Sequence, residues 1–100
     1  MYESLQDKGI STYADSIEVY YQRALRFNQD NNEALTGLSF HYATSDNLEK
    51  RMKALELAKE LVKVEKSSRS YYVLAAAYYS LDDEINEVIA IKKAEELEEH

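Results

Sequence analysis

The stretch Tyr20–Leu35, YYQRALRFNQDNNEAL, contains a change of direction between two helices. In its first half, large apolar residues recur three and four positions apart, which is the pattern of one face of an α-helix. Its middle, residues 28–32, is a run of Asn, Gln and Asp, a composition typical of turns and helix N-caps. Glu33, Ala34 and Leu35 then suit the first turn of a second helix, where an acidic side chain is favourable. We therefore predict a junction between two helices here, and ask whether the chain repeats it.

Outward from this junction, apolar stripes alternate with short polar turns. Asp30 with Glu33, and Asp46 with Glu49, have the spacing of a capping box, which predicts two of the helix starts. The chain contains 2 Gly and no Pro, so it lacks the turn residues that sandwiches and barrels need. We therefore predict an all-α fold of antiparallel helix hairpins. The apolar stripes place its helices over residues 12–28, 32–44, 48–63, 71–79 and 85–97.

Two of these helices carry an apolar stripe that we expect to face the core. The stripe of the long third helix comprises Leu48, Met52, Leu55, Ala58, Leu61 and Val62. The stripe of the last helix comprises Ile85, Val88, Ile89, Ile91, Ala94 and Leu97.

The chain matches itself when it is shifted by 36 residues. The segment Leu35–Tyr42, LTGLSFHY, overlays the segment Tyr71–Tyr78, YYVLAAAY. Each has a large residue, Leu three positions later, a small residue next, and Tyr three positions after that. On the second helix of each unit, Ile17, Tyr21 and Ala24 overlay Ala54, Ala58 and Leu61 at a shift of 37, and then Glu87, Ile91 and Ala94 at a shift of 33. Because Glu87 stands where this pattern has a small packing residue, we expect the last unit to be the solvated end. A period near 34 predicts stacked helical hairpins.

These repeated residues resemble the tetratricopeptide repeat (TPR) family, whose first helix carries a large residue, Leu, a small residue and Tyr. Leu35, Leu38, Ser39 and Tyr42 fill these positions once, and Tyr71, Leu74, Ala75 and Tyr78 fill them again. The resemblance implies one domain, residues 1–100, built as a short right-handed solenoid of about 2.5 repeats. Its parts are residues 11–31 (second helix of a partial first repeat), 32–67 (second repeat) and 68–99 (third repeat). So few repeats are near the lower limit of stability, so we expect a fragment of a longer array, an N-terminal segment that completes the first repeat, or self-association.

The sequence contains no pattern typical of catalytic or metal-binding residues. It has no Cys, and its two His, His41 and His100, have no further ligands at metal-binding spacing. It has no nucleophile motif and no Gly-rich phosphate loop, and its carboxylates follow helix faces and caps. We therefore expect no enzyme activity and no cofactor, and we interpret His41 as a partly exposed helix residue.

Charge and hydropathy exclude two classes of partner. The net charge of −7 argues against nucleic acid, because neutralising phosphates needs clustered Lys and Arg. It leaves room for basic partners. No apolar run approaches the ~20 residues of a membrane span, so we expect no membrane insertion. If the chain is complete, the absence of a signal peptide predicts a cytoplasmic protein.

The tyrosines divide into two groups. Tyr21, Tyr42 and Tyr78 occupy packing positions of the repeat. In the family that the chain resembles, the first helices line a concave face, and this implies a peptide-binding surface of Thr36, Phe40, Arg69, Tyr72, Ala76 and Tyr79. Exposed aromatic side chains on such a face are typical of recognition surfaces. We therefore predict a protein–protein interaction module that binds a basic or apolar peptide. The alternative is a homo-oligomerisation or scaffolding unit, in which these surfaces pack on another copy.

Overall fold

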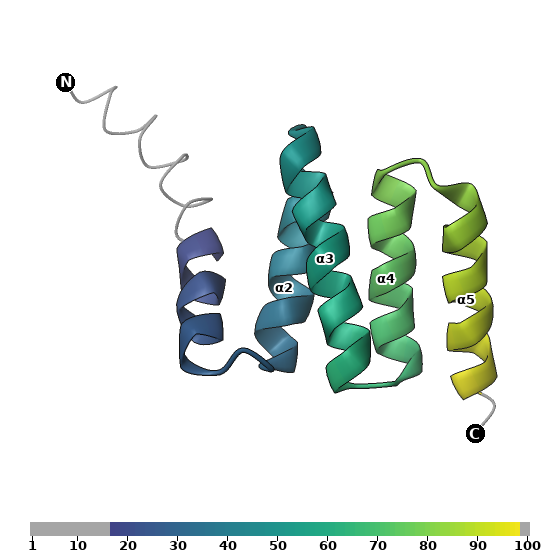
Figure 1. Ribbon diagram of the computed structural model, residues 1–100, viewed down its shortest axis with the longest axis horizontal. Helices are drawn as coiled ribbons and strands as arrows, with labels where there is room; N and C mark the ends of the chain where they lie inside the picture. Colours follow the sequence, from purple (N-terminus) through teal and green to yellow (C-terminus); the bar gives the residue numbers. More distant parts are fainter. Residues whose placement is uncertain (1–16, 99–100) are drawn as a thin grey trace.

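The computed structural model describes residues 17–98, in which α-helices follow one another in a row (Figure 1). A first helix covers residues 17–27 of this range. Each helix runs antiparallel to the one before it (Figure 1). The all-α prediction is thus confirmed, while the predicted helix start near Thr12 lies outside the described residues. The later helices are α2 (Asn32–Ala43), α3 (Leu48–Val64), α4 (Ser68–Ser80) and α5 (Glu84–Glu98).

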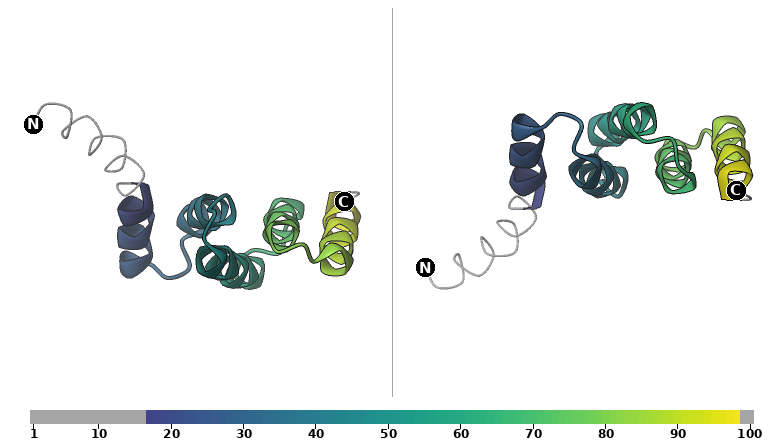
Figure 2. Two further views of the ribbon diagram at one scale, coloured as in Figure 1. Left: turned by 90° about the horizontal axis from the view of Figure 1, so that it is seen from above. Right: turned by 90° about the horizontal axis from the view of Figure 1, so that it is seen from below.

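The four labelled helices form two hairpins that pack against each other. Contacts join α2 to α3, α3 to α4 and α4 to α5, and α2 also contacts α4. Viewed from above or below, α2 and α4 lie on one side of the row and α3 lies on the other (Figure 2). The first helices of the two hairpins are therefore neighbours on a shared side.

The two hairpins follow each other with a uniform period of 36 residues. The helix α2 begins at Asn32 and α4 at Ser68, while α3 begins at Leu48 and α5 at Glu84. The buried alanines Ala54 and Ala58 of α3 recur 36 residues later as the buried Ala90 and Ala94 of α5. This corrects the predicted shift of 33 residues for the last helix. Ala90, and not Glu87, is the small packing residue of the last unit, so the alanines of α5 hold the places that those of α3 hold in the unit before.

Side-chain caps fix the helix starts. Asn31 Oδ1 accepts a hydrogen bond from Ala34 N at 3.0 Å, and Asn47 Oδ1 accepts one from Glu49 N at 2.8 Å. Asn31 belongs to the polar run of residues 28–32 in which an N-cap was predicted, whereas Asn47 lies one residue after the predicted Asp46; the helices begin at Asn32 and Leu48. An Asn side chain caps about as well as Asp.

The helix α4 starts with a reciprocal cap. Ser67 Oγ accepts from Ser70 N at 3.2 Å, and Ser70 Oγ accepts from Ser67 N at 3.1 Å. The same turn is tied to the start of α2, because the Asn32 side-chain amide donates to the carboxylate of Glu65. The turn before α4 is thus fixed both locally and by a residue of the preceding hairpin.

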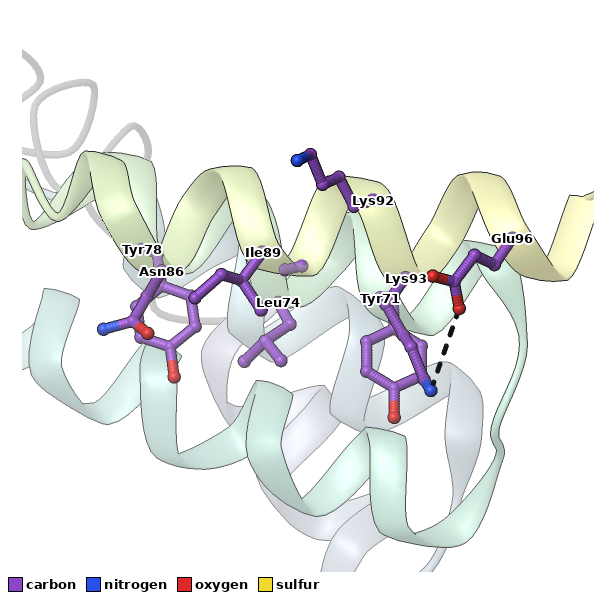
Figure 3. Close-up of a pocket in the computed structure, with 9 residues that line it drawn as sticks. Tyr71, Leu74, Tyr78, Asn86, Ile89, Lys92, Lys93 and Glu96 are labelled. Atoms are coloured by element: carbon purple, nitrogen blue, oxygen red, sulfur yellow. Dashed lines mark ion pairs between the residues drawn. The ribbon is translucent and has the colours of Figure 1, made fainter.

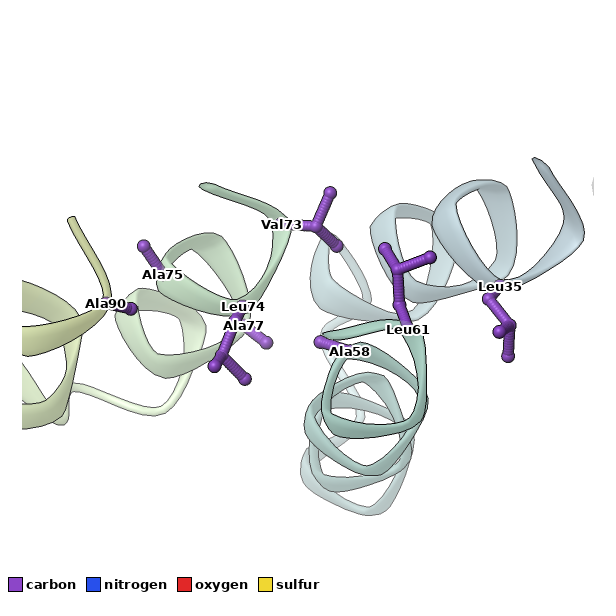
Figure 4. Packing of buried hydrophobic residues seen from close by; sticks show 8 residues of the cluster. All are labelled: Leu35, Ala58, Leu61, Val73, Leu74, Ala75, Ala77 and Ala90. Atoms are coloured by element: carbon purple, nitrogen blue, oxygen red, sulfur yellow. The ribbon is translucent and has the colours of Figure 1, made fainter. Parts of the chain in front are cut away.

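The core is built largely from small residues. Ser39 Oγ of α2 donates to the Ala54 carbonyl of α3 at 2.9 Å, and both residues are buried. Small side chains at the helix–helix contacts let the backbones approach closely, and the large residues fill the space beside them. One cluster joins all four labelled helices (Figure 4): Leu35, Ala58, Leu61, Val73, Leu74, Ala75, Ala77 and Ala90. A second cluster comprises Leu38, Tyr42 and Ala54, with Tyr21 and Leu25 of the first helix packed against it.

The two predicted apolar stripes are buried only in part. Leu48 and Met52 of α3 are exposed, as are Ile85, Val88 and Ile89 of α5. Among the labelled helices, α5 contacts only α4, and it turns its alanines toward that contact. Its larger apolar residues on the other faces therefore have no helix of the described chain to cover them.

Candidate functional site

The first described helix is held on α2 by a contact that needs glycine at position 37. The ring of Tyr21 lies over Gly37, so a Cβ at this position would be 2.6 Å from Tyr21 Oη. The counterparts at the next junction, 37 and 36 residues further on, are Ala58 of α3 and Val73 of α4, which share a buried cluster. At the first junction the large Tyr21 ring packs on a residue that has no side chain. At the second junction the small Ala58 is paired with the larger Val73. Tyr21 is a packing residue, as predicted.

A polar cluster around Glu18 completes this attachment. Tyr42 Oη donates to Glu18 Oε2 at 2.9 Å and accepts from Gln22 Nε2 at 3.0 Å. Glu18 Oε1 also lies 3.7 Å from Lys50 Nζ and 3.8 Å from His41 Nε2. Burial raises the pKa of Tyr42, and the hydrogen bond to the Glu18 carboxylate adds to the rise. The carboxylate thus connects the first helix to both helices of the hairpin that follows.

The three predicted aromatic site residues are exposed. The exposed fraction is 45% for Phe40, 39% for Tyr72 and 69% for Tyr79. Phe40 lies on α2, and the two tyrosines lie on α4, the helix that α2 contacts. Large apolar side chains left open to water on adjacent helices are typical of an interaction surface.

The other three predicted residues extend this surface. Arg69 of α4 is exposed, while Thr36 of α2 and Ala76 of α4 are half-buried. Thr36 and Tyr72 are 36 residues apart and hold equivalent places on their helices. The six residues therefore lie on the two helices that share one side of the row (Figure 2).

The acidic end of α5 borders this surface beside Tyr72. Partial burial raises the pKa of Tyr72, and the carboxylates of Glu98 and Glu95 raise it further. Arg69 precedes Tyr72 by one turn of α4 and is the one cation among the six residues. The edge near Glu95 and Glu98 therefore favours a positively charged partner group.

Two hollows among the described residues lie elsewhere. One of about 410 Å³ opens between α4 and α5, and a smaller one of about 80 Å³ lies between the first helix and α2. None of the six predicted residues lines either of them. Tyr78, predicted as packing, is half-buried and lines the larger hollow, and so does Ile89, predicted as core.

Possible metal ligands are dispersed over the described helices. Within residues 17–98, no group of three or more His, Cys, Asp or Glu side chains is placed to hold a metal ion. His41 is partly exposed, as predicted, and faces the carboxylate of Glu18. No helix in this range combines the length and the apolar character that crossing a membrane requires.

Comparison of the chain with models of known protein families, with curated proteins and with solved structures found no match. A functional proposal therefore rests on the residues of the chain itself and on the surfaces described above.

Proposed function

We propose that the chain is a TPR-like solenoid that serves as a protein–protein interaction module. Its peptide-binding surface comprises Thr36, Phe40, Arg69, Tyr72, Ala76 and Tyr79. The observation that carries the proposal is the exposure of Phe40, Tyr72 and Tyr79 on two adjacent helices. Buried aromatic anchors contribute most of the binding energy in many protein interfaces, and a partner would bury these three.

The helix arrangement supports the TPR-like part of the proposal. Two hairpins of equal period pack so that each helix contacts its chain neighbour and the first helices contact each other. Repeat proteins bury their apolar faces in this way, unit against neighbouring unit. A right-handed turn of the row would place the shared side of α2 and α4 on the concave face.

The partner that fits this surface is a peptide with both apolar and basic residues. Its apolar side chains would lie on Phe40 and Tyr79, and a Lys or Arg would lie near Glu95 and Glu98 beside Tyr72. The net charge of −7 favours encounter with a basic segment. Because two helices offer only a small surface, we expect moderate affinity.

A selection from a random peptide library on the immobilised protein tests the proposal. Peptides that bind the unchanged protein should be enriched in apolar and basic residues. The triple variant Phe40→Ala, Tyr72→Ala, Tyr79→Ala should bind them at least tenfold more weakly. The matched control is Tyr20→Ala with Phe27→Ala, which removes two exposed aromatic rings elsewhere. Equal binding by the triple variant, with circular dichroism confirming its fold, would contradict the proposal.

A second candidate function is homo-oligomerisation, which the exposed Ile85, Val88 and Ile89 of α5 favour. Sedimentation velocity over a hundredfold range of concentration separates the two candidates. A concentration-dependent dimer that Ile85→Glu with Val88→Glu dissolves would support oligomerisation. A monomer over the whole range would exclude it.

A further inference from the structure

The hollow of about 410 Å³ between α4 and α5 has an apolar floor and a wall that carries the amine of Lys93. Tyr71 and Lys93 line one end of it, and Tyr78 and Asn86 line the other (Figure 3). Its volume is within the ~300–1,000 Å³ that is typical of ligand pockets. The floor comes from Tyr71, Leu74 and Tyr78 of α4, and the wall comes from Asn86, Ile89, Ala90, Lys92, Lys93 and Glu96 of α5.

The period of 36 residues gives this floor a counterpart within the molecule. Tyr71, Leu74 and Tyr78 correspond to Leu35, Leu38 and Tyr42 of α2. The α2 residues are only 2%, 3% and 4% exposed, whereas the two tyrosines of α4 are half-buried. The same surface is therefore closed on the first hairpin and partly open on the second.

The helix of residues 17–27 closes the surface of the first hairpin. Tyr21 and Leu25 pack against the cluster of Leu38 and Tyr42. Glu18 adds a carboxylate that accepts from Tyr42 Oη at 2.9 Å and lies 3.7 Å from Lys50 Nζ. The surface of the first hairpin is thus covered by an amphipathic helix, in which the carboxylate of Glu18 precedes the apolar residues Tyr21 and Leu25.

The helix α3 does not close the second hairpin in the same way. It packs on α4, but no Cα atom of α3 lies within 8 Å of a Cα atom of α5. At the place of Leu57, which packs into the core, the second hairpin has Lys93. The groove between α4 and α5 consequently keeps an apolar floor beside an amine.

The charge of the groove differs from that of the chain. In a chain whose net charge is −7, Lys93 places an amine on the wall of the groove beside Tyr71, whereas the amine of the adjacent Lys92 points to the other side of α5 (Figure 3). Lys93 Nζ lies 4.0 Å from a carboxylate oxygen of Glu96, but both side chains are more than half exposed, so this pair leaves the amine available. Because Glu96 makes one end of the groove acidic, an incoming carboxylate fits best on the side of Lys93 that faces Ile89 (Figure 3).

We propose that the groove between α4 and α5 binds an amphipathic helix of a partner protein. The partner inserts a Leu or aromatic side chain between Tyr71, Leu74 and Tyr78. It also places a Glu or Asp against Lys93. This is a second site, independent of the aromatic surface of α2 and α4, and it has the opposite charge preference.

Two synthetic helical peptides test the proposal. They share one stripe of Leu and Tyr at positions i, i+3, i+4 and i+7, and they differ in flanking residues, which are Glu in the acidic peptide and Lys in the basic one. Titration into the ¹⁵N-labelled full chain should shift the amides of Leu74, Ile89 and Lys93. The acidic peptide should bind at least tenfold more tightly than the basic peptide at low salt.

Variants make the test specific to the groove. The charge reversal Lys93→Glu should invert the preference between the peptides, and Ile89→Asp should weaken both by at least tenfold. The matched control Lys92→Glu, at an amine that points away from the groove, should keep the preference for the acidic peptide. All three residues are exposed, so these changes leave the fold intact. The triple variant Phe40→Ala, Tyr72→Ala, Tyr79→Ala should bind the acidic peptide with unchanged affinity. This result would separate the groove from the proposed peptide-binding surface of α2 and α4.

Three results would overturn the proposal. The first is equal binding of both peptides by the unchanged chain. The second is a set of amide shifts that maps away from α4 and α5. The third is a dimer in which α5 is buried and no peptide binds, since the groove would then serve a second copy of the chain.

Discussion

Because Tyr21 lies against Gly37, the substitution Gly37→Ala should have opposite effects on stability in the presence and in the absence of the Tyr21 ring. Replacing Gly by Ala in a helix interior usually stabilises the helix by about 1 kcal/mol. Here the added Cβ would collide with the Tyr21 ring, because it would be 2.6 Å from the phenol oxygen. The substitution Gly37→Ala should therefore destabilise the unchanged protein and stabilise the variant Tyr21→Ala.

The magnitudes follow from burial. Truncating a fully buried aromatic side chain to Ala costs ~3–5 kcal/mol. Tyr21 is half-buried, so we expect Tyr21→Ala to cost about 2 kcal/mol. Displacing the ring by Gly37→Ala loses a similar amount and gains about 1 kcal/mol of helix propensity, a net loss of about 1 kcal/mol. The double-mutant cycle should then give a coupling of about 2 kcal/mol, within the usual range for residues in contact.

Urea unfolding followed by circular dichroism at 222 nm measures all four proteins of this cycle. With a slope of ~1–2 kcal/mol per molar urea, 1 kcal/mol moves the midpoint by about 0.5–1 M. Hydrogen exchange of the α2 amides distinguishes release of the first helix from global unfolding. If Gly37→Ala raises the midpoint equally with and without the Tyr21 ring, the close contact is not formed and the reasoning is wrong.

Two further predictions concern the helix caps. Ser67→Ala should lower the free energy of unfolding by about 1 kcal/mol, because it removes the acceptor for Ser70 N. The control Ser68→Ala, at the first helical position, should change it by under ~0.5 kcal/mol. Equal urea midpoints for the two variants would contradict the capping role of Ser67. Hydrogen bonds from the side chain and backbone of Asn86 lower the pKa of Asp83. The resulting stabilisation is complete above the unfolded pKa of about 3.9 and is lost as the pH falls through the folded pKa. The unchanged chain should therefore have a higher urea midpoint than Asp83→Asn at pH 7, and this difference should shrink toward pH 3. A difference that does not depend on pH would contradict the stabilising role of the Asp83 carboxylate.

Much of the fold could be predicted from the sequence because its signals are local. The spacing of Leu35, Leu38 and Tyr42 defines a buried helix face, and its recurrence at Tyr71, Leu74 and Tyr78 sets the period. The register of α5 could not be predicted in the same way. Both Glu87 and Ala90 fall on one face of a helix, and only the packing against α4 decides that Ala90 is buried.

The exposure of single residues is harder to predict than the helices, because it depends on neighbouring helices. Phe40 and Tyr79 fall off the packing stripe, which is visible in sequence, and both are exposed. Ile85 and Ile89 look like core residues in sequence, since apolar side chains at helical spacing usually are. Whether they are buried depends on a helix beside α5, and the amino-acid pattern of α5 contains no information about that neighbour.

The unequal volumes at the two helix junctions have a consequence for the order of the hairpins. Chains with similar repeats can misassemble by exchanging one unit for another, within a chain or between chains. An exchange here would set the Tyr21 ring against Val73, where the two overlap, and Ala58 against Gly37, where a void remains. Both errors carry a cost in packing, although either junction is well filled in its native order. The residue volumes at the two junctions thus favour the native order of the hairpins over an exchanged order.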